Sequence, residues 1–496
     1  MEPAKYNYQD ALELLETIRR GARPENPAIA SRANQNPMTD KLEGLKGVPS
    51  LEGMKEWLET LGHSNANVNN LNIIHVAGTK GKGSTCTFTR NFLHAHSIRT
   101  GFPRKIGTYT GPSVQCIRER IQIDDRPVSK DMFTKYFFED KKHDEGLRKP
   151  RYLQFLALLA FHTFIREGVD VAIFEVHHGG EFDATNVIEQ PIVTGITSLG
   201  LDHVAQLGST LEDIAWHKAG IFKSSAPAFS VPQESGPREI MRERAEEKGI
   251  VLEFVPTDNR LPTNYTVLDI PVQRLNCSLA LKLAEEFLRI KVPDHKISGE
   301  DISNGVKNFS LAGRFEVVDD GKSEWFVDMA HNVLSLKQAA EWFAKNTDED
   351  VVSLSLAIAQ NQEIPCRSYN LWRALLENKA EPGNVIFTTA SCKKQKITSI
   401  QQDIFAPETL NQTLCDTYSR EWKQADPRDI VSSDPTIEKA VELAMKMGVS
   451  EDGVQAFVIG CPHMVGEVLN ILRPRPSLQS STCYFVGIAG IGTRFR

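Results

Sequence analysis

Short apolar runs alternate with longer segments of helical periodicity along most of this chain. In the first part, the pattern predicts strands at 73–76, 170–175 and 192–197. It predicts helices at 8–20, 51–61, 84–96, 130–145, 152–167, 210–221 and 272–290. Strands that alternate with helices are typical of mostly parallel sheets flanked by helices, so we expect an α/β fold.

A second series of the same kind follows a break at 291–313, which contains Pro293 and Gly299. Its expected strands lie at 315–318, 325–328, 351–357, 384–388 and 456–459. Its expected helices lie at 333–345, 369–377, 408–424, 435–448 and 463–472. We therefore predict two domains, 1–298 and 299–473, and a tail at 474–496 for which the pattern predicts no structure. Segment 22–46, rich in Pro, Asn and Ala, is predicted to be a surface loop or a disordered insert.

Composition limits the class of protein and the kinds of partner that this chain can have. Its 496 residues are 41% hydrophobic and 24% charged, which is enough to bury large cores. The net charge of −7 argues against a global attraction to nucleic acid or to anionic membrane. No apolar run approaches the roughly 20 residues that a membrane-spanning helix needs, and the N-terminus lacks the apolar core of a signal peptide. The eight cysteines form no C-x-x-C pair, which favours reduced thiols. We expect a cytoplasmic monomer that binds neither nucleic acid nor membrane.

The stretch 72–85, NIIHVAGTKGKGST, sets a short apolar strand before a turn with three glycines, and a predicted helix follows. Glycines let backbone N–H groups approach phosphate oxygens, and a helix N-terminus adds partial positive charge. Lys82 can reach the β- and γ-phosphates, and the hydroxyl of Ser84 or Thr85 can ligate Mg²⁺. The alternative is a tight turn with a solvated lysine, which two lysines and three glycines disfavour. The predicted nucleoside triphosphate site comprises Gly78, Thr79, Lys80, Gly81, Lys82, Gly83, Ser84 and Thr85.

Three later segments add candidate ligands. Glu175 follows a predicted strand and can bind Mg²⁺ directly or through water; the alternative is a surface glutamate that caps the strand. Next to it, His177 and His178 are adjacent in extended chain and point apart, which disfavours joint ligation of a transition metal. His203 could complete a Mg²⁺ site or be a hydrogen-bonded structural histidine, and Lys218 could offset phosphate charge or be a solvated helical lysine.

The order of these motifs resembles folylpolyglutamate synthases, members of the Mur-ligase-like superfamily of ATP-dependent amide ligases. The motifs are GTKGKGS, then E-V-x-x-G-G-x-x-D-A-T-N, then S-L-G-L-D-H and W-x-K-A-G-I. The resemblance extends over about residues 6–472 and is nearest to the fungal-type enzymes at 384–448. It implies a P-loop domain like the Mur-ligase central domain, followed by a smaller Rossmann-like α/β domain.

The resemblance also implies an activity and a set of site residues. A carboxylate would attack the γ-phosphate of Mg²⁺-ATP to give an acyl phosphate, and the amine of an incoming glutamate or other amino acid would then displace phosphate. Lys82 would hold the β- and γ-phosphates, and Ser84, Glu175 and His203 would ligate Mg²⁺. Lys218 would be carbamylated and help bind a second Mg²⁺. Gln273, Asn276, Arg314 and Asp328 would contact ATP, and His331 would lie near the incoming amino acid.

The departures from the family fall on positions that face the two other substrates. Segment 101–114 is longer and more basic than the family's loop, with Gly111-Pro112-Ser113 in place of Ser-Pro-His. His177-His178, Asp328-Met329-Ala330-His331, Ala359-Gln360-Asn361-Gln362-Glu363 and Cys461-Pro462 also replace family elements. The expected substrate residues are Arg104, Lys105, Tyr109, Ser113, His177, His331 and Cys461.

We therefore predict a diverged paralogue that ligates an amino acid to a non-folate carboxylate acceptor. Arg104 and Lys105 suggest an acceptor with an extra anionic group, and Tyr109 could stack on a flat ring. A true tetrahydrofolylpolyglutamate synthase and a non-catalytic nucleotide-binding paralogue stay open as alternatives. An unrelated P-loop kinase would not explain Lys218 or the second α/β unit.

Overall fold

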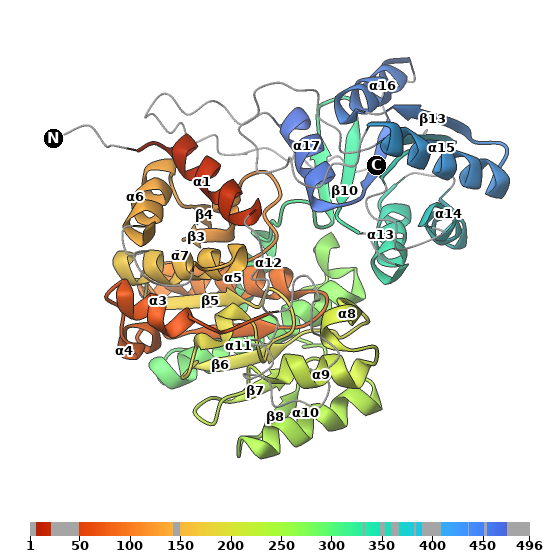
Figure 1. Cartoon of the computed structure of the whole chain (residues 1–496). Coiled ribbons are helices and arrows are strands. Elements are labelled where there is room, and N and C mark those ends of the chain that lie inside the picture. The colour runs from red at the N-terminus through yellow and green to blue at the C-terminus, as the bar shows by residue number, and fades with distance from the viewer. Residues whose placement is uncertain are drawn as a thin grey trace.

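The computed structural model shows two α/β units, each built on one sheet (Figure 1). The described residues are 6–20, 49–141, 149–330, 333–347, 353–358, 367–380, 383–388, 408–434, 436–450 and 454–473. Expectations for 22–46, for 359–363 and for the tail at 474–496 lie outside them. None of the helices in these ranges is long and apolar enough to cross a membrane.

The first unit contains an eight-stranded sheet in the order β4-β3-β2-β5-β1-β6-β7-β8. The strands β2, β5, β1, β6, β7 and β8 run parallel, and β3 and β4 extend the sheet in antiparallel fashion. Their bounds are β1 Ile74–Ala77, β2 Ile106–Tyr109, β3 Ile121–Ile123, β4 Arg126–Pro127, β5 Val171–Glu175, β6 Val193–Ile196, β7 Ala228–Ser230 and β8 Leu252–Phe254.

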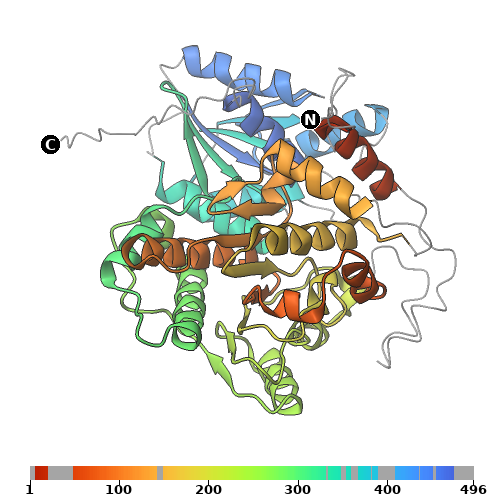
Figure 2. The ribbon, with the colours of Figure 1, turned by 90° about the vertical axis from the view of Figure 1, so that its left-hand side faces the viewer.

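Helices cover both faces of this sheet, as Figure 2 shows from the side. They are α1 Tyr8–Arg20, α3 Met54–Thr60, α4 Asn65–Asn69, α5 Lys82–Thr100, α6 Lys130–Lys141, α7 Tyr152–Glu167, α8 Val204–Leu207, α9 Leu211–Ala219, α10 Ser235–Glu247, α11 Pro271–Lys291 and α12 Gly299–Lys307. Short 3₁₀ helices lie at Ile117–Arg120, Ala184–Val187 and Thr266–Leu268.

Because successive side chains of a strand point to opposite faces of the sheet, the core of this unit consists of two apolar clusters, one on each face. On β5, Ala172 and Phe174 join the cluster formed with α1, α3, α6 and α7. Val171 and Ile173 join the cluster formed with α5, α11 and α12 on the other face. A strand buried on both faces has apolar residues at every position, which explains why VAIF was recognisable as a strand from sequence.

The second unit has a six-stranded sheet in the order β13-β12-β11-β14-β10-β9, in which only β9 is antiparallel. The strands are β9 Glu316–Asp319, β10 Glu324–Asp328, β11 Ser353–Ile358, β12 Asn384–Thr388, β13 Ile430–Asp434 and β14 Gln455–Ile459. The helices are α13 Val333–Lys345, α14 Arg367–Glu377, α15 Glu408–Ala425, α16 Ile437–Ser450 and α17 Pro462–Leu472. Trp325 and Val327 face α16 and α17, whereas Phe326 faces α13, α14 and α15, so this sheet is also covered on both faces.

The two units meet at a close contact between the segment after β2 and helix α17. Val114 of the first unit is buried in the apolar cluster of the second unit. A Cβ atom on Gly466 of α17 would lie 2.0 Å from the Val114 carbonyl oxygen, so only glycine permits this approach. Gln115 Nε2 donates a hydrogen bond to Asn470 Oδ1 at 3.0 Å across the same boundary.

The α/β fold and the main elements agree with the sequence-based expectations, with two kinds of difference. Strands β2, β3, β4, β7 and β8 were not predicted, because they are only two to four residues long, and helices α4, α8 and α10 were not predicted either. Helix α12, which the predicted division assigned to the second domain, packs on α5 and places Ile302 and Val306 in the core of the first unit. We therefore propose a domain boundary between Lys307 and the start of β9.

Replacing Gly305 tests the packing of α12 on α5. A Cβ at position 305 would lie 2.4 Å from Cδ1 of Phe92, whose side chain is fully buried. We expect Gly305→Ala to lower the free energy of unfolding of the first unit by about 1–3 kcal/mol, since overpacking forces neighbours to shift. Urea denaturation followed by circular dichroism measures this. Gly299→Ala on the same helix is the control, because no atom lies within 4 Å of its added Cβ. Equal stability of both variants would contradict the described packing.

Candidate active site

The glycine turn after β1 is shaped by two close approaches of its backbone. Gly78 has φ +144°, and a Cβ there would lie 1.8 Å from Oγ1 of Thr197. Gly81, with φ +88°, precedes the first residue of α5, and its Cβ would lie 2.2 Å from Oδ1 of Asn276. Both positions therefore require glycine. The turn leads directly into the N-terminus of α5, where a helix favours bound anions.

Lysine side chains gather around this turn. Lys82 Nζ lies 3.4 Å from the carbonyl oxygen of Thr79 and 3.9 Å from Oε1 of Glu175. Lys80 Nζ lies 3.3 Å from Oδ2 of Asp202. Lys218, from α9, donates to the carbonyl oxygen of Gly78 at 2.8 Å and is fully buried behind the turn. This concentration of positive groups suits an anionic ligand with several phosphates.

Burial changes the ionisation of two of these lysines. Burial, reinforced by the positive charge of Lys82, holds the pKa of Lys218 well below its usual value. Burial also lowers the pKa of Lys80, although the neighbouring Asp202 opposes this shift. Burial therefore favours the neutral amine of Lys218, which is the nucleophilic form, while Nζ stays in contact with the turn.

Glu175, at the carboxyl end of β5, is the buried carboxylate of the site. Its Oε2 accepts a hydrogen bond from the backbone N–H of Gly111 at 3.0 Å. Burial raises its pKa, and the positive charge of Lys82 opposes the rise. Since the Gly111 N–H occupies Oε2 and Lys82 lies 3.9 Å from Oε1, Oε1 of Glu175 could still bind a cation.

The predicted Mg²⁺ ligands Ser84, Glu175 and His203 all line one cavity. His203 has φ +51° before α8, and its ring centroid lies 5.2 Å from that of His178. Its side chain is half exposed, with Nε2 at 4.0 Å from Asp202 Oδ1. In the described part of the chain, no three carboxylate, imidazole or thiol side chains gather closely enough to hold a metal ion. The hydroxyl and carboxylate oxygens fit the hard donors that Mg²⁺ prefers, and joint ligation stays a prediction.

Three residues of the predicted nucleotide and metal site do not line the cavity, namely Gly78 and Thr85 of the phosphate turn and Lys218 of α9. Ser84 lines the cavity, but the next residue, Thr85, is fully buried and its Oγ1 faces the carbonyl oxygen of Asn276 at 3.5 Å. Successive helical residues point about 100° apart, so only one of the two hydroxyls can face the ligand. Lys218 likewise lies behind the turn rather than on the cavity wall. The side chain of Thr85 therefore does not face the cavity, and its expected contact with the cofactor stays a prediction.

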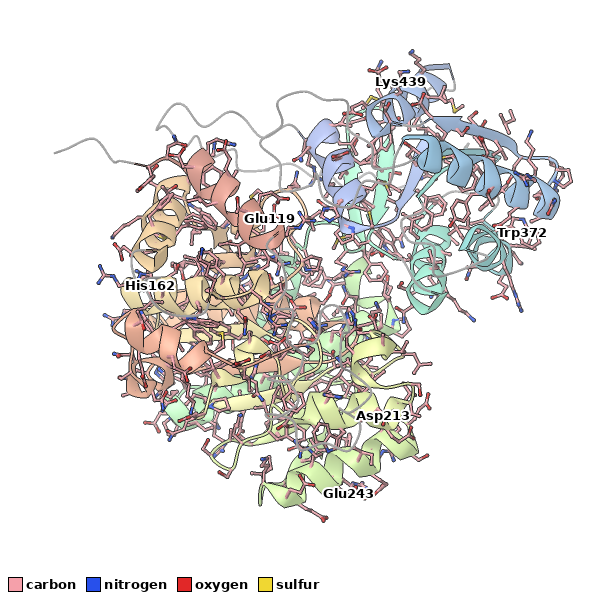
Figure 3. The ribbon with its side chains drawn as sticks, in the orientation of Figure 1. Glu119, His162, Asp213, Glu243, Trp372 and Lys439 are labelled. Atoms are coloured by element: carbon pink, nitrogen blue, oxygen red, sulfur yellow. The ribbon has the colours of Figure 1, made fainter. Side chains whose placement is uncertain are left out.

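The cavity has a volume of about 710 Å³ and is lined by both units. In Figure 3, Glu119, which lines it, lies where the units meet, whereas Glu243 and Lys439 lie at opposite ends of the molecule. Two buried amide atoms on its wall have no hydrogen-bond partner in the protein, Gln273 Nε2 and Asn276 Oδ1. Since buried polar atoms normally find partners, this pair fits a polar ligand such as a nucleotide.

The second unit contributes Arg314 and Asp328, as the motif analysis predicted. Asp328 ends β10 and its Oδ2 accepts a hydrogen bond from the backbone N–H of Phe315 at 2.9 Å. Burial raises the pKa of Asp328 to about 6, although Arg314 opposes the shift. Cys461 precedes α17 and lines the same cavity. His331 lies outside the described residues.

Arg104 and Lys105 do not line the cavity, so the structure gives no support to their expected contact with the acceptor, which stays a prediction. They precede β2, so they lie at the amino end of that strand, whereas the cavity lies at the carboxyl ends of the strands. Arg104 is exposed, 3.7 Å from Asp170. Lys105 Nζ donates to the Glu167 carbonyl oxygen at 2.8 Å. The basic character of segment 101–114 therefore belongs to the opposite edge of the sheet.

The other predicted acceptor residues divide between the cavity wall and the core. His177 lines the cavity, but Tyr109 is fully buried, with its hydroxyl oxygen 2.6 Å from Nε2 of His177, so its ring is unavailable for stacking on a ligand. Ser113 is half-buried and does not line the cavity, although its neighbours Pro112 and Val114 do. The expected roles of Tyr109 and Ser113 as substrate contacts therefore need correction.

Several cavity residues were not predicted as site residues. Arg90, Arg120, Gln122 and His463 all line the cavity. Arg90 NH1 donates to Gln122 Oε1 at 2.7 Å, and Arg120 has a buried Nε without a partner. Arg120 was visible in the R-E-R-I segment, but nothing in the helical pattern of α5 distinguishes Arg90.

Comparison with known proteins gives consistent matches over most of the chain. It is 35% identical over 460 residues to the folylpolyglutamate synthase of Neurospora crassa, covering 86% of each chain. It is 36% identical over 460 residues to the Saccharomyces cerevisiae folylpolyglutamate synthase, covering 86% of this chain and 81% of that one. The chain matches no family model.

Solved structures share the fold at lower identity. Mycobacterium tuberculosis folylpolyglutamate synthase complexed with ADP has a TM-score of 0.70 at 20% identity, covering 94% of this chain and 99% of that one. Escherichia coli FolC in complex with DHPP and ADP has a TM-score of 0.65 at 20% identity, covering 92% and 100%.

Asp328→Asn tests the electrostatics of the second unit's contribution to the site. Burial raises the pKa of Asp328 from its ordinary value of 3.8 to about 6, so the folded protein binds more protons than the unfolded chain between these values. The unfolding free energy therefore falls by up to about 3 kcal/mol as the pH rises from about 4 to about 6, and stays lower above. The asparagine amide of the variant keeps an acceptor for the Phe315 N–H without this loss.

Without nucleotide, we expect the variant to exceed the wild type in unfolding free energy at pH 7 and to match it near pH 4. Urea unfolding at a series of pH values measures the difference. Asp319→Asn, an exposed carboxylate on β9, is the matched control and should leave the pH profile unchanged. If the unfolding free energies of Asp328→Asn and of the wild type changed with pH in parallel, the Asp328 carboxyl would have an ordinary pKa.

Proposed function

This chain belongs to the folylpolyglutamate synthase family of ATP-dependent amide ligases, and from that premise we propose that it adds glutamate to the carboxylate of a folate. The observation that carries the proposal is the phosphate turn, with Lys82, beside two unpartnered buried amide atoms in one cavity. ADP-bound neighbours with the same fold support a nucleotide there.

The acceptor in this proposal differs from the non-folate acceptor expected from sequence. That expectation depended on segment 101–114, where Gly111-Pro112-Ser113 replaces Ser-Pro-His and where Arg104, Lys105 and Tyr109 are new. The side chains of Arg104, Lys105 and Tyr109 do not line the cavity. The relatives that match across 86% of the chain are folylpolyglutamate synthases. A folate acceptor therefore has better support, and the remaining departures at His177 and Cys461 would adjust its fit.

In the proposed reaction, an oxygen of the acceptor carboxylate attacks the γ-phosphorus of ATP, and the bond to the ADP oxygen breaks. The amine of glutamate then attacks the acyl phosphate carbon, the amide bond forms, phosphate leaves and the amine loses a proton. Lys82 stabilises the negative charge on the transferred phosphoryl group, since such reactions depend on positioning and charge neutralisation. Its Nζ is already held beside the turn by Thr79 and Glu175.

Further residues would bind the nucleotide from the helix and from the second unit. Gln273 and Asn276 would supply their unpartnered amide atoms, and Arg314 and Asp328 would contact it from the opposite wall. Ser84, Glu175 and His203 would hold Mg²⁺, which neutralises phosphate charge when bound. A cavity closed between two units would keep water from an acyl phosphate that hydrolyses easily.

Lys218 and His331 complete the proposal. Carbamylation needs a free amine, and the burial that lowers the pKa of Lys218 favours this form. The resulting carbamate would be an anion that could help bind a second Mg²⁺. His331 would lie near the amine of the incoming amino acid. Bound carbamate can be detected by ¹³C NMR with labelled bicarbonate.

Lys82→Ala tests the proposed reaction. The wild type, given Mg²⁺-ATP, glutamate and tetrahydrofolate, should release ADP and yield a product heavier by a glutamate residue. We expect Lys82→Ala to lower kcat/KM by several kcal/mol of transition-state stabilisation, about 10²–10³-fold or more, since a preorganised charge is lost. Product mass spectrometry and coupled ADP release measure both. Lys55→Ala is a control on an exposed lysine that pairs with Glu189. Wild-type protein that binds ATP but yields no amide would indicate a non-catalytic paralogue.

The double variant Arg104→Ala, Lys105→Ala tests the corrected placement of segment 101–114. Because both side chains lie at the opposite edge of the sheet from the cavity, kcat and the KM for tetrahydrofolate should stay within about twofold of the wild type. Some stability will be lost with the contacts to Asp170 and Glu167. A large rise in the folate KM would restore the original assignment of these residues to the acceptor.

A further inference from the structure

A buried chain of polar side chains lies directly behind the candidate active site. Asp183 Oδ1 lies 3.4 Å from Nδ1 of His177, and the other ring nitrogen, Nε2, lies 2.6 Å from the Tyr109 hydroxyl. Asp183 and Tyr109 are almost completely buried. The imidazole of His177 thus has a partner near each of its two nitrogens, and these partners fix the orientation of the ring.

One end of this chain is held firmly. Asp183 Oδ1 accepts hydrogen bonds from the backbone N–H and the hydroxyl of Thr185, at 3.0 and 2.7 Å. Its Oδ2 accepts from the backbone N–H of His178 at 3.1 Å. A carboxylate with this many partners has a defined orientation and gives His177 a defined tautomer and ring position.

The other end of the chain reaches the backbone that holds Glu175. Tyr109 is the last residue of β2 and pairs with Phe174 of β5, the residue before Glu175. Two residues after Tyr109, the N–H of Gly111 donates to Glu175 Oε2 at 3.0 Å. The position of Tyr109 therefore sets where this N–H points, and the N–H determines which oxygen of Glu175 is left for a ligand.

We propose that His177 is a positioning residue that acts through Tyr109 and Gly111 to orient the carboxylate of Glu175 toward the divalent cation of the bound nucleotide. The inference rests on the proposed function, since it concerns the same nucleotide site. Hydrogen-bond partners behind a metal ligand typically change metal affinity by about 10–100-fold when they are removed. Here the partner is a backbone N–H, and His177 and Tyr109 keep it in place.

Tyr109→Phe provides the first test, with Tyr136→Phe as a matched control. Both tyrosines are buried in the same unit, and the Tyr136 hydroxyl makes an equivalent hydrogen bond to Glu167 Oε1 at 2.7 Å, away from the cavity. We expect Tyr109→Phe to weaken Mn²⁺ binding to the ADP complex by about tenfold or more, and Tyr136→Phe to leave it unchanged. Electron paramagnetic resonance of free Mn²⁺ measures this without turnover.

His177→Gln separates this role from the contact between Tyr109 and Arg120. The Tyr109 oxygen also interacts with the Arg120 side chain, which Tyr109→Phe removes but His177→Gln leaves in place. We expect His177→Gln to weaken Mn²⁺ binding to a similar degree, and the double variant to lose no more than either single variant, because both act through one chain.

The outcomes distinguish the two proposals. Wild-type protein that fails to bind Mn²⁺ with ADP would overturn the proposed function itself. Wild-type binding that is matched by both Tyr109→Phe and His177→Gln would overturn the positioning role alone. If the double variant lost Mn²⁺ affinity by the sum of the two single effects, the proposal that His177 acts through Tyr109 would also be overturned. Circular dichroism and the unfolding midpoint of each variant confirm that it is folded.

Discussion

The rest of the site depends on the position of the glycine turn after β1. The backbone of this turn passes close to the segment after β6 and to helix α11. Gly78 lies against Thr197 of the segment after β6, and Gly81 lies against Asn276 of α11. Because the backbone has no room to move away, Lys82 enters the cavity and the carbonyl of Gly78 turns back toward Lys218. The lysine side chains around the turn therefore stay together, and burial deprives Lys218 and Lys80 of their ordinary hydration.

The arrangement of the first sheet explains why this turn meets the other candidate residues. In a parallel sheet, the carboxyl ends of neighbouring strands lie at one edge, and β1 is flanked by β5 and β6. Glu175 ends β5, and the segment with His203 follows β6. The second unit then closes the cavity with the ends of its own strands, where Asp328 ends β10 and Cys461 follows β14. In both units, the carboxyl ends of parallel strands therefore face the same cavity.

Much of the fold and part of the site could be predicted from sequence, and the failures share a cause. Fully buried parallel strands such as β5 and β14 are continuous apolar runs that can be recognised from sequence. The phosphate turn can be recognised from the spacing of its glycines. Strand β2 has four residues between Pro103 and Gly111, too few for a periodic signal. Without β2, residues before and after it could not be assigned to opposite edges of the sheet, so Arg104 and Lys105 were placed in the site.

Other features require strand order, which no local pattern contains. Tyr109 and His177 meet only because β2 and β5 are neighbours in the sheet. Thr85 and Ser84 are equivalent in the motif, and only the rotation of α5 against α11 separates the hydroxyl that faces the cavity from the buried one. Arg90 becomes a cavity residue for the same reason.

The contact between Val114 and Gly466 has a mechanical consequence for this two-unit molecule. Val114 is part of the first unit by sequence but part of the second unit's core by packing. Pulling the units straight apart would withdraw this side chain into water, whereas rotation about it would leave it buried. If the two units rotate against each other, the segment from Gly111 to Gln115 would therefore lie near the axis, and the residues around it would travel least. Glu175, whose Oε2 accepts a hydrogen bond from the Gly111 N–H, would then stay near this axis, whereas the wall with Arg314 and Asp328 would move further.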